Sequence, residues 1–406
     1  MSSHRFEELA RDAQSALPVE DARAGVLSAL AVKVRAEAEA LWAAAPRVVG
    51  MTEEGTVRLT ARALAPLGRQ VEAVLEGLAA LGGYASGHEE ADLSAVARRA
   101  AELGAELDFV QRAEARDHVY WAEGRGRALF LRAAPISVAE AMRERLYGSV
   151  DTVIFTSATL RAGNSFEYFC RQVGLLDSEG EAVAPLTQLA VPSSFDYATQ
   201  SALYLPTSLP EPREPGFPEA VAEEVARLVE VTGGRAFVLF TSLRNMERVH
   251  SLLSGRLPYP MLLQGEAPKP VLLDAFQSTP SVLFASASFW EGVDVPGDAL
   301  SLVVLDKLPF ASPTHPVVAA RIEALEEAGR EPFSSYQLPE AALALRQGFG
   351  RLIRTRTDRG IVALLDVRVG RKAYGRQLLA GLPPARRFKE IRPLADWFRS
   401  GDRQSV

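Results

Sequence analysis

Apolar residues recur at intervals of three and four along the first part of the chain, from His4 to about Arg116. The run from Val26 to Val34 (Val-Leu-Ser-Ala-Leu-Ala-Val-Lys-Val) shows this interval clearly. Such positions share one face of a helix, so the pattern predicts a bundle of long helices. Breaks between the helices are expected near Pro18, at 46–55 and at 82–92, where glycine, proline and polar residues cluster.

The pattern becomes an alternation of apolar and polar residues after residue 117. Two such runs flank Gly124-Arg-Gly126, which predicts a β-hairpin. Tyr120 and Trp121 lie beside Arg125 and Arg127, so these rings and charges could hold a nucleic-acid strand. The alternative is an amphipathic hairpin that buries its rings.

After residue 150 the chain alternates between short apolar runs and helical segments. The segment 152–156 is expected to be a buried strand that leads into Ser157-Ala-Thr159, where open α/β sheets bind ligands. Further strands are expected at 236–240, 261–264, 282–285, 301–305 and 361–366, with helices at 217–231, 243–253, 270–277 and 339–349. This order predicts an α/β domain, a mostly parallel sheet with helices on both faces, which follows the all-α bundle.

Composition limits the possible functions. With 406 residues, 48% of them hydrophobic, the chain can form two or three domains. Its net charge of -6 excludes a global basic field, so any nucleic-acid contact must be a local patch. The single cysteine, Cys170, excludes an intrachain disulfide and an all-cysteine metal site, and it is expected to be a small core residue. Because no signal peptide or membrane span is apparent, a soluble cytoplasmic protein without a membrane partner is expected.

The most informative polar cluster is formed by Gln347, Arg351 and Arg354. Residues three and four apart share a helix face, so the three side chains can point at one ligand. The planar guanidinium group matches phosphate oxygens, and an arginine on a transferring phosphoryl group is worth roughly 10³ to 10⁵ in rate. The cluster therefore favours a nucleotide phosphate, and a solvated basic helix face is the alternative.

Two further polar clusters follow predicted strands. Thr241 and Ser242 open a helix, where free amides and hydroxyls could hold a phosphate or where one hydroxyl simply caps the helix. In the second cluster, Gly292 allows close backbone approach, and Glu291 and Asp294 offer acceptors to a ribose or a cation. We expect all three clusters to lie on one side of the sheet.

Equally informative is what the sequence lacks. It contains no Gly-x-x-x-x-Gly-Lys-[Ser/Thr] loop and no Asp-Glu pair at a strand end to hold magnesium. The chain thus has arginines that could contact a phosphate but lacks the loop that would hold it. This combination predicts one half of a composite site, whose other half is supplied from elsewhere.

On these motifs the chain resembles the XPD/DinG branch of the superfamily 2 helicases, and among them the bacterial DinG-like proteins. The resemblance spans nearly the whole chain. Four stretches are similar to helicase motifs III, V and VI, namely Val153–Leu160, Ser288–Gly297, Asp306–Phe310 and Gln347–Arg354. Together these motifs are highly specific. The stretch Phe240-Thr-Ser242 is a weaker match to motif IV.

The resemblance implies a RecA-like motor fold and a role for each motif. Gln347, Arg351 and Arg354 are expected to act in catalysis at the γ-phosphate, with an arginine finger among them. Ser157, Ala158 and Thr159 are expected to couple the nucleotide state to DNA. The implied nucleotide-binding residues are Glu291, Gly292, Asp294 and Gly350, and the implied DNA-binding residues are Thr241, Ser242, Arg244 and Ser288.

Members of this family are ATP-driven 5′ to 3′ DNA helicases with two motor domains, an arch of helices inserted in the first, and often an iron-sulphur cluster. Their phosphate loop, cluster cysteines and Asp-Glu-Ala-His box precede the arch, and His4 is similar to the last residue of that box. The expected domains are therefore an arch-like bundle (1–115), the end of the first motor domain (116–190) and the second motor domain (191–406). The strand at 152–156 would then be an apolar edge without its sheet.

Two hypotheses follow from the resemblance. In the first, the chain is the C-terminal part of a DinG-like helicase that acts in DNA repair. ATP and Mg²⁺ bind in the intact motor, any iron-sulphur cluster lies upstream, and this chain alone holds no cofactor or metal. Its partners are single-stranded DNA and the missing first motor domain, and it is not expected to hydrolyse ATP appreciably by itself. In the second, it is a non-enzymatic protein that binds single-stranded DNA or a partner.

Overall fold

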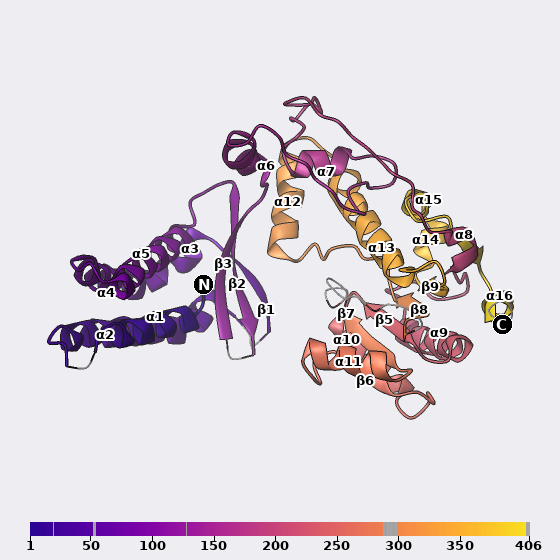
Figure 1. The fold of residues 1–406 in the computed structure, drawn as a ribbon, viewed down its shortest axis with the longest axis horizontal. Coiled ribbons are helices and arrows are strands. Elements are labelled where there is room, and N and C mark those ends of the chain that lie inside the picture. Colours follow the sequence, from indigo (N-terminus) through magenta and orange to yellow (C-terminus); the bar gives the residue numbers. More distant parts are fainter. Residues whose placement is uncertain are drawn as a thin grey trace. The chain divides into compact units, whose positions relative to one another are not determined.

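The structure is a computed structural model that describes residues 1–18, 20–51, 54–126, 128–286, 289, 295 and 299–402, and the side chains of all of these except residues 54, 351, 401 and 402. The chain forms two compact units (Figure 1). Unit 1 comprises Met1–Val138 and Ser312–Gly329, and unit 2 comprises Ala139–Ala311 and Arg330–Val406. These limits differ from the expected domains, because the hairpin and the segment 312–329 both belong with the helical bundle.

Unit 1 contains the predicted bundle of long helices, coloured indigo to purple in Figure 1. Its helices are α1 (Ser3–Ser15), α2 (Ala24–Val49), α3 (Ala61–Leu64), α4 (Gly68–Ser86) and α5 (Ala91–Arg112), with the short 3₁₀ turn η1 (Ala65–Leu67). Their apolar faces meet in one core that includes Phe6, Leu41 and Leu81. Two predicted breaks are shifted. Helix α2 continues through Pro46, and Gly82 lies within α4, where a Cβ atom would come within 3.4 Å of the Cβ of Ala100 on α5.

A three-stranded antiparallel sheet completes unit 1. Its strands are β1 (Glu54–Leu59), β2 (His118–Arg125) and β3 (Ala128–Pro135), in the order β1-β2-β3. The hairpin β2–β3 confirms the predicted alternation, whereas β1 was not predicted. Because side chains alternate across a strand, Tyr120 and Ala122 join the helical core, whereas Val119 and Trp121 face the other way.

The outer face of this sheet is covered by α12 (Pro316–Glu327), which contacts β1 and β2 although it follows them by about 190 residues or more in the chain. Trp121 and Val119 pack with Ala320, and Arg58 pairs with Glu323. Tyr120 and Trp121 are only 4% and 7% exposed, so of the two interpretations the structure supports the amphipathic hairpin that buries its rings, and not a hairpin that stacks them on nucleic acid. Helices on both sides of the sheet bury them.

Unit 2 is built on seven described strands, all paired in parallel, in the order β10-β4-β9-β8-β5-β7-β6. They are β4 (Ser201–Tyr204), β5 (Ala236–Phe240), β6 (Met261–Leu263), β7 (Val282–Ser286), β8 (Leu302–Leu305), β9 (Gly360–Leu364) and β10 (Arg386–Phe388). The predicted parallel α/β sheet is confirmed. The strands β4 and β10 escaped prediction because three or four residues carry little periodic signal.

Helices cover both faces of this sheet. One face packs against α9 (Phe217–Thr232), α10 (Leu243–Leu253) and α16 (Ile391–Asp402). The other packs against α11 (Lys269–Ser278), α13 (Leu338–Leu352) and α15 (Ala373–Ala380). The short elements α8 (Tyr197–Gln200), the π-helix η5 (Phe333–Gln337) and α14 (Arg368–Arg371) lie in the connections. No helix in the described ranges is both long and apolar enough to cross a membrane.

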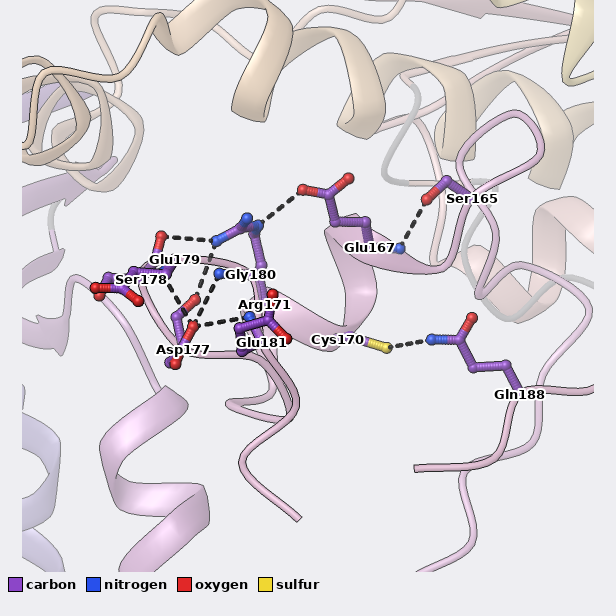
Figure 2. A network of polar contacts seen from close by, with 10 residues as sticks. All are labelled: Ser165, Glu167, Cys170, Arg171, Asp177, Ser178, Glu179, Gly180, Glu181 and Gln188. Atoms are coloured by element: carbon purple, nitrogen blue, oxygen red, sulfur yellow. Dashed lines mark hydrogen bonds and ion pairs between the residues drawn. The ribbon is translucent and has the colours of Figure 1, made fainter. Parts of the chain in front are cut away.

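The first part of unit 2 is held by local polar contacts rather than by a sheet. It contains α6 (Ala139–Met142), the π-helix η2 (Arg143–Tyr147) and α7 (Glu167–Gln172). Asp177 accepts hydrogen bonds from the backbone N–H groups of Glu179, Gly180 and Glu181 at 2.8 to 3.0 Å, and Arg171 donates to two carbonyls of the same turn (Figure 2). Cys170 is buried, as predicted for a small core residue, and burial raises the pKa of its thiol.

The predicted strand at 152–156 is wrong. Residues 152–156 have no strand geometry, and Ile154 is 82% exposed. A strand requires a hydrogen-bonding neighbour, and no described segment pairs with these residues. Leu189 and Val191 in the same part of unit 2 are 78% and 77% exposed. We refer to Ile154, Leu189 and Val191 as the exposed apolar residues.

Candidate functional site

Two buried carboxylates lie at the carboxyl ends of neighbouring strands of unit 2. Asp306 follows β8 and Asp366 follows β9, and both are 0% exposed. Asp306 accepts a hydrogen bond from the backbone N–H of Thr241 at 3.1 Å, and Asp366 accepts one from the N–H of Leu308 at 3.0 Å. Arg368 also donates to both oxygens of Asp366, from its backbone N–H, Nε and Nη2, so this second carboxylate is fully paired.

Burial raises the pKa of Asp306 to about 6, and the neighbouring Lys307 ammonium, 3.9 Å away, only partly opposes this effect. Among the described residues, none donates a hydrogen bond to the other carboxylate oxygen of Asp306, Oδ2. Ionisation of Asp306 is therefore unfavourable at this position. The sequence reasoning quoted Asp306 within a motif but assigned it no role, although its place directly after an apolar strand was a usable signal.

For the cluster at Thr241, two interpretations were given, a phosphate contact and a helix cap, and the structure contains the helix cap. Ser242 is the N-cap of α10, and its hydroxyl accepts from the N–H of Asn245 at 3.5 Å. The side chains of Thr241 and Arg244 are exposed beside it. Asp306 thus fixes the backbone at Thr241, and the exposed hydroxyl and guanidinium groups remain available to a ligand.

Helix α13 carries Gln347, Gly350 and Arg351. Gln347 is exposed, and Arg351 follows it by one helical turn on the same face, although the side chain of Arg351 is outside the described residues. No atom lies within 4 Å of a Cβ atom built on Gly350, so the backbone there is accessible. The helix ends at Leu352 with an extended residue, Ile353, so Arg354 lies beyond the helix and does not share its face.

Asp358 holds the chain that follows this helix. Its side chain accepts from the backbone N–H groups of Arg354 and Thr355, both at 2.7 Å, and from the Thr355 hydroxyl at 2.5 Å. Asp358 is 6% exposed. This carboxylate therefore sets the position of the backbone at Arg354. Sequence reasoning missed it, and the only signal was an acidic residue in a short polar turn before a strand.

The C-terminal end of α13 lies at the amino-terminal edge of the sheet. A Cβ atom on Gly360, the first residue of β9, would lie 2.5 Å from Cδ1 of Leu352. Thr241 and Asp306, in contrast, follow the carboxyl ends of their strands. The prediction that all the clusters lie at one side of the sheet is therefore wrong for the Thr241 cluster and the end of α13, which lie at opposite edges. A helix that connects two parallel strands must run back along them, so its end lies at the opposite edge.

Ser288, Glu291, Gly292 and Asp294 lie outside the described residues. Phe289 and Val295 in the same stretch are described, and they are 5% and 4% exposed. Both belong to the buried core that contains Phe349 of α13. Phe289 and Val295, which flank the predicted nucleotide-binding acids in the sequence, are thus anchored in the same core as the helix that carries Gln347.

Ser157, Ala158 and Thr159 form an exposed turn in the first part of unit 2. The Ser157 hydroxyl accepts the Thr159 N–H at 3.1 Å, and the two hydroxyls are 3.2 Å apart. No described group of three or more His, Cys, Asp or Glu side chains is arranged to hold a metal ion.

Comparisons with known proteins fit this arrangement. Residues 225–385 match the helicase C-terminal domain family. The ATP-dependent DNA helicase YoaA of Haemophilus influenzae is 37% identical over 284 residues, which cover 70% of this chain and 43% of that protein. The ATP-dependent helicase DinG of Mycobacterium tuberculosis is 39% identical over 256 residues, which cover 63% of this chain and 38% of that protein.

The fold is also similar to solved structures. A structure titled XPD_Helicase covers 96% of this chain and 65% of its own, with a TM-score of 0.54 and 14% identity, which shows a shared fold. The chain spans less than half the length of the curated relatives given above. The chain is thus similar in sequence to the YoaA and DinG helicases, its residues 225–385 match the helicase C-terminal domain family, and it shares the fold of the structure titled XPD_Helicase.

Proposed function

We propose that this chain supplies the second motor domain of a DinG-like, ATP-dependent 5′ to 3′ DNA helicase. The observation that carries the proposal is the exposed Gln347 on α13, with Arg351 one turn later on the same helix face, inside the region that matches the helicase C-terminal domain. In this function Arg351 and Arg354 neutralise the charge that develops on the γ-phosphate, and Gln347 orients the attacking water.

The remaining motif residues have supporting roles in this proposal. Glu291, Gly292, Asp294 and Gly350 contact the nucleotide, and Thr241, Ser242, Arg244 and Ser288 contact the DNA backbone. Ser157, Ala158 and Thr159 transmit the nucleotide state. Phe289, Val295 and Phe349 share one core, which supports this division, because a shift of α13 would change the packing of Phe289 and Val295.

The site is complete only when another motor domain supplies the phosphate loop and the Mg²⁺ ligands. The sequence contains no such loop, and magnesium, when bound, would neutralise the phosphates and orient them. The exposed apolar residues also support a missing partner. Ile154, Leu189 and Val191 have the largest exposed fractions among the large hydrophobic residues of the described structure.

The direct test is ATP hydrolysis by the pure chain, with and without single-stranded DNA. We expect no activity above that of the Gln347→Ala variant, and we expect activity to appear when the phosphate-loop half of a relative is added. DNA-stimulated hydrolysis by the pure chain alone would refute the division of the site.

The second candidate function is non-enzymatic binding of single-stranded DNA. The exposed side chains of Thr241 and Arg244 at the start of α10 favour it. It predicts salt-sensitive binding of single strands without any nucleotide. If no single strand binds at low salt, this candidate is rejected.

A further inference from the structure

The edge of the unit 2 sheet at β10 carries a concentration of positive charge. The segment from Arg371 to Arg399 contains eight basic and two acidic residues, in a chain whose net charge is -6. All eight basic side chains are exposed. We refer to these eight side chains as the edge patch.

The edge patch extends around the edge of the sheet. Among the described strands, β10 pairs only with β4, so it is the last of them on this side. The preceding helix α15 packs into the core on one face through Leu378, and α16 packs into the core on the other face through Leu394 and Trp397. The chain therefore crosses from one face to the other at Arg386 and Arg387, and basic side chains lie on both sides of this crossing.

Most of this charge is not neutralised within the protein. In the described ranges, only Arg371 of the edge patch has an acidic ion-pair partner, Glu211 at 3.8 Å. Elsewhere in unit 2, some exposed arginines are paired with acids, as Arg248 is with Glu219 at 2.8 Å and Arg256 with Glu223 at 2.6 Å. An uncompensated cluster of this size attracts a polyanion.

The edge patch lacks the apolar groups that other anionic partners require. Of the four aromatic residues in the segment 371–399, Phe388 and Trp397 are buried, at 9% and 8% exposure, and Tyr374 and Phe398 are half-buried. No large hydrophobic side chain between 371 and 399 is among the exposed ones of the described structure. A single strand binds by base stacking on exposed rings, and a membrane surface takes up exposed apolar side chains. Neither is available, whereas contacts with a duplex backbone require only basic groups.

We propose that the edge patch binds the phosphate backbone of double-stranded DNA, outside the single-strand contacts at Thr241 and Arg244. This inference rests on the proposed function, in which DNA is the substrate. It adds a second surface that holds the duplex portion of that substrate, and each basic side chain in contact with a phosphate releases a counterion.

The test is binding of a fluorescent DNA duplex, and of one strand of the same sequence, to the Arg386→Ala, Arg387→Ala, Lys389→Ala triple variant over a salt series. Duplex affinity is expected to fall on the order of tenfold at low salt, and the slope of log K against log salt to fall by roughly 2 to 3. Single-strand affinity is expected to stay the same. The triple variant Arg213→Ala, Arg248→Ala, Arg256→Ala removes equal charge elsewhere and is expected to bind duplex like the wild type.

A second variant, Arg392→Ala with Arg399→Ala, changes only exposed positions of α16 and is expected to show the same selective loss if the β10 variant does not fold. Wild-type duplex binding by either folded variant would overturn the inference. An equal loss of single-strand and duplex binding would overturn the assignment to duplex, and so would selective loss of binding to phosphatidylglycerol vesicles. DNA-stimulated ATP hydrolysis in the reconstituted motor tests the proposed function separately, because the edge patch is not part of the phosphate site.

Discussion

Asp306 accepts the backbone N–H of Thr241 at 3.1 Å, which ties the carboxyl end of β8 to that of β5. Asp306 is completely buried, and burial raises its pKa to about 6. The residue that fixes the backbone of a candidate DNA contact is thus itself sensitive to pH.

The stability of the protein should therefore depend on the ionisation of Asp306. Because the folded pKa lies above the unfolded value, the favourable contribution is complete below about pH 4 and is lost as the pH rises through about 6. A difference of about two pKa units corresponds to about 3 kcal/mol. Asp306→Asn should remove this dependence, so its free energy of unfolding relative to the wild type should rise by about 2 to 3 kcal/mol between about pH 4 and pH 8.

Denaturant unfolding of both proteins across this pH range measures the difference. Asp274→Asn, at an exposed position on α11, is the control and should follow the wild type. A constant difference between wild type and Asp306→Asn at all pH values would show that folding does not raise the pKa of Asp306.

Removal of the Asp358 side chain should loosen the backbone at Arg354. Asp358→Ala leaves the N–H groups of Arg354 and Thr355 without their acceptor, which should cost about 1 to 3 kcal/mol in the free energy of unfolding. Asp358→Asn keeps one carbonyl oxygen and should cost less. Thermal and denaturant unfolding of the two variants compare these costs, and an equal loss would mean that the two backbone hydrogen bonds contribute little.

Packing rather than charge should hold α12 against the sheet of unit 1. Trp121→Ala should destabilise unit 1 by about 3 to 5 kcal/mol, because it leaves a cavity against Ala320. Arg58 and Glu323 pair at 2.6 and 2.7 Å, but both are about half exposed, so Arg58→Ala should cost less than about 1 kcal/mol. Denaturant unfolding ranks the two variants, and a larger effect at Arg58 would contradict this order.

The exposed apolar residues should matter for assembly and not for the stability of the folded chain. Ile154→Asp should change the free energy of unfolding by less than about 0.5 kcal/mol, because this side chain is already in water. The same variant should fail to assemble with the phosphate-loop half of a relative in a co-purification experiment. Val271→Asp alters an equally apolar exposed residue on α11 and should assemble normally. Normal assembly of Ile154→Asp would exclude Ile154 from the interface.

The sequence was sufficient to predict most of the unit 2 sheet, because β5, β7, β8 and β9 are continuous apolar runs separated by amphipathic helices. Local patterns were insufficient where the environment comes from distant segments. Tyr120 and Trp121 are buried by helices on both sides of their strand, and one of these, α12, lies almost 200 residues further along the chain. The apolar run at Ile154 is not a strand, since a strand also needs a neighbour.

The candidate site was predicted in part for similar reasons. The exposed Gln347 on a helix follows from its sequence spacing. The end of α13 at Leu352 does not, because it depends on Asp358, whose side chain competes for the backbone N–H groups beyond the helix. Similarly, Asp306 contacts Thr241 only because β5 and β8 are neighbours in the sheet, which no local pattern states.

The role of Arg351 is tested most directly by DNA-stimulated ATP hydrolysis, measured on this chain mixed with the phosphate-loop half of a relative. Arg351→Ala should abolish hydrolysis, a loss on the order of 10³-fold or more, while single-strand binding stays within about twofold of the wild type. Arg346→Ala, on another face of α13, is the matched control and should retain hydrolysis. A reconstituted motor that hydrolyses ATP at the wild-type rate with Arg351→Ala would contradict the assignment of this helix to the phosphate site.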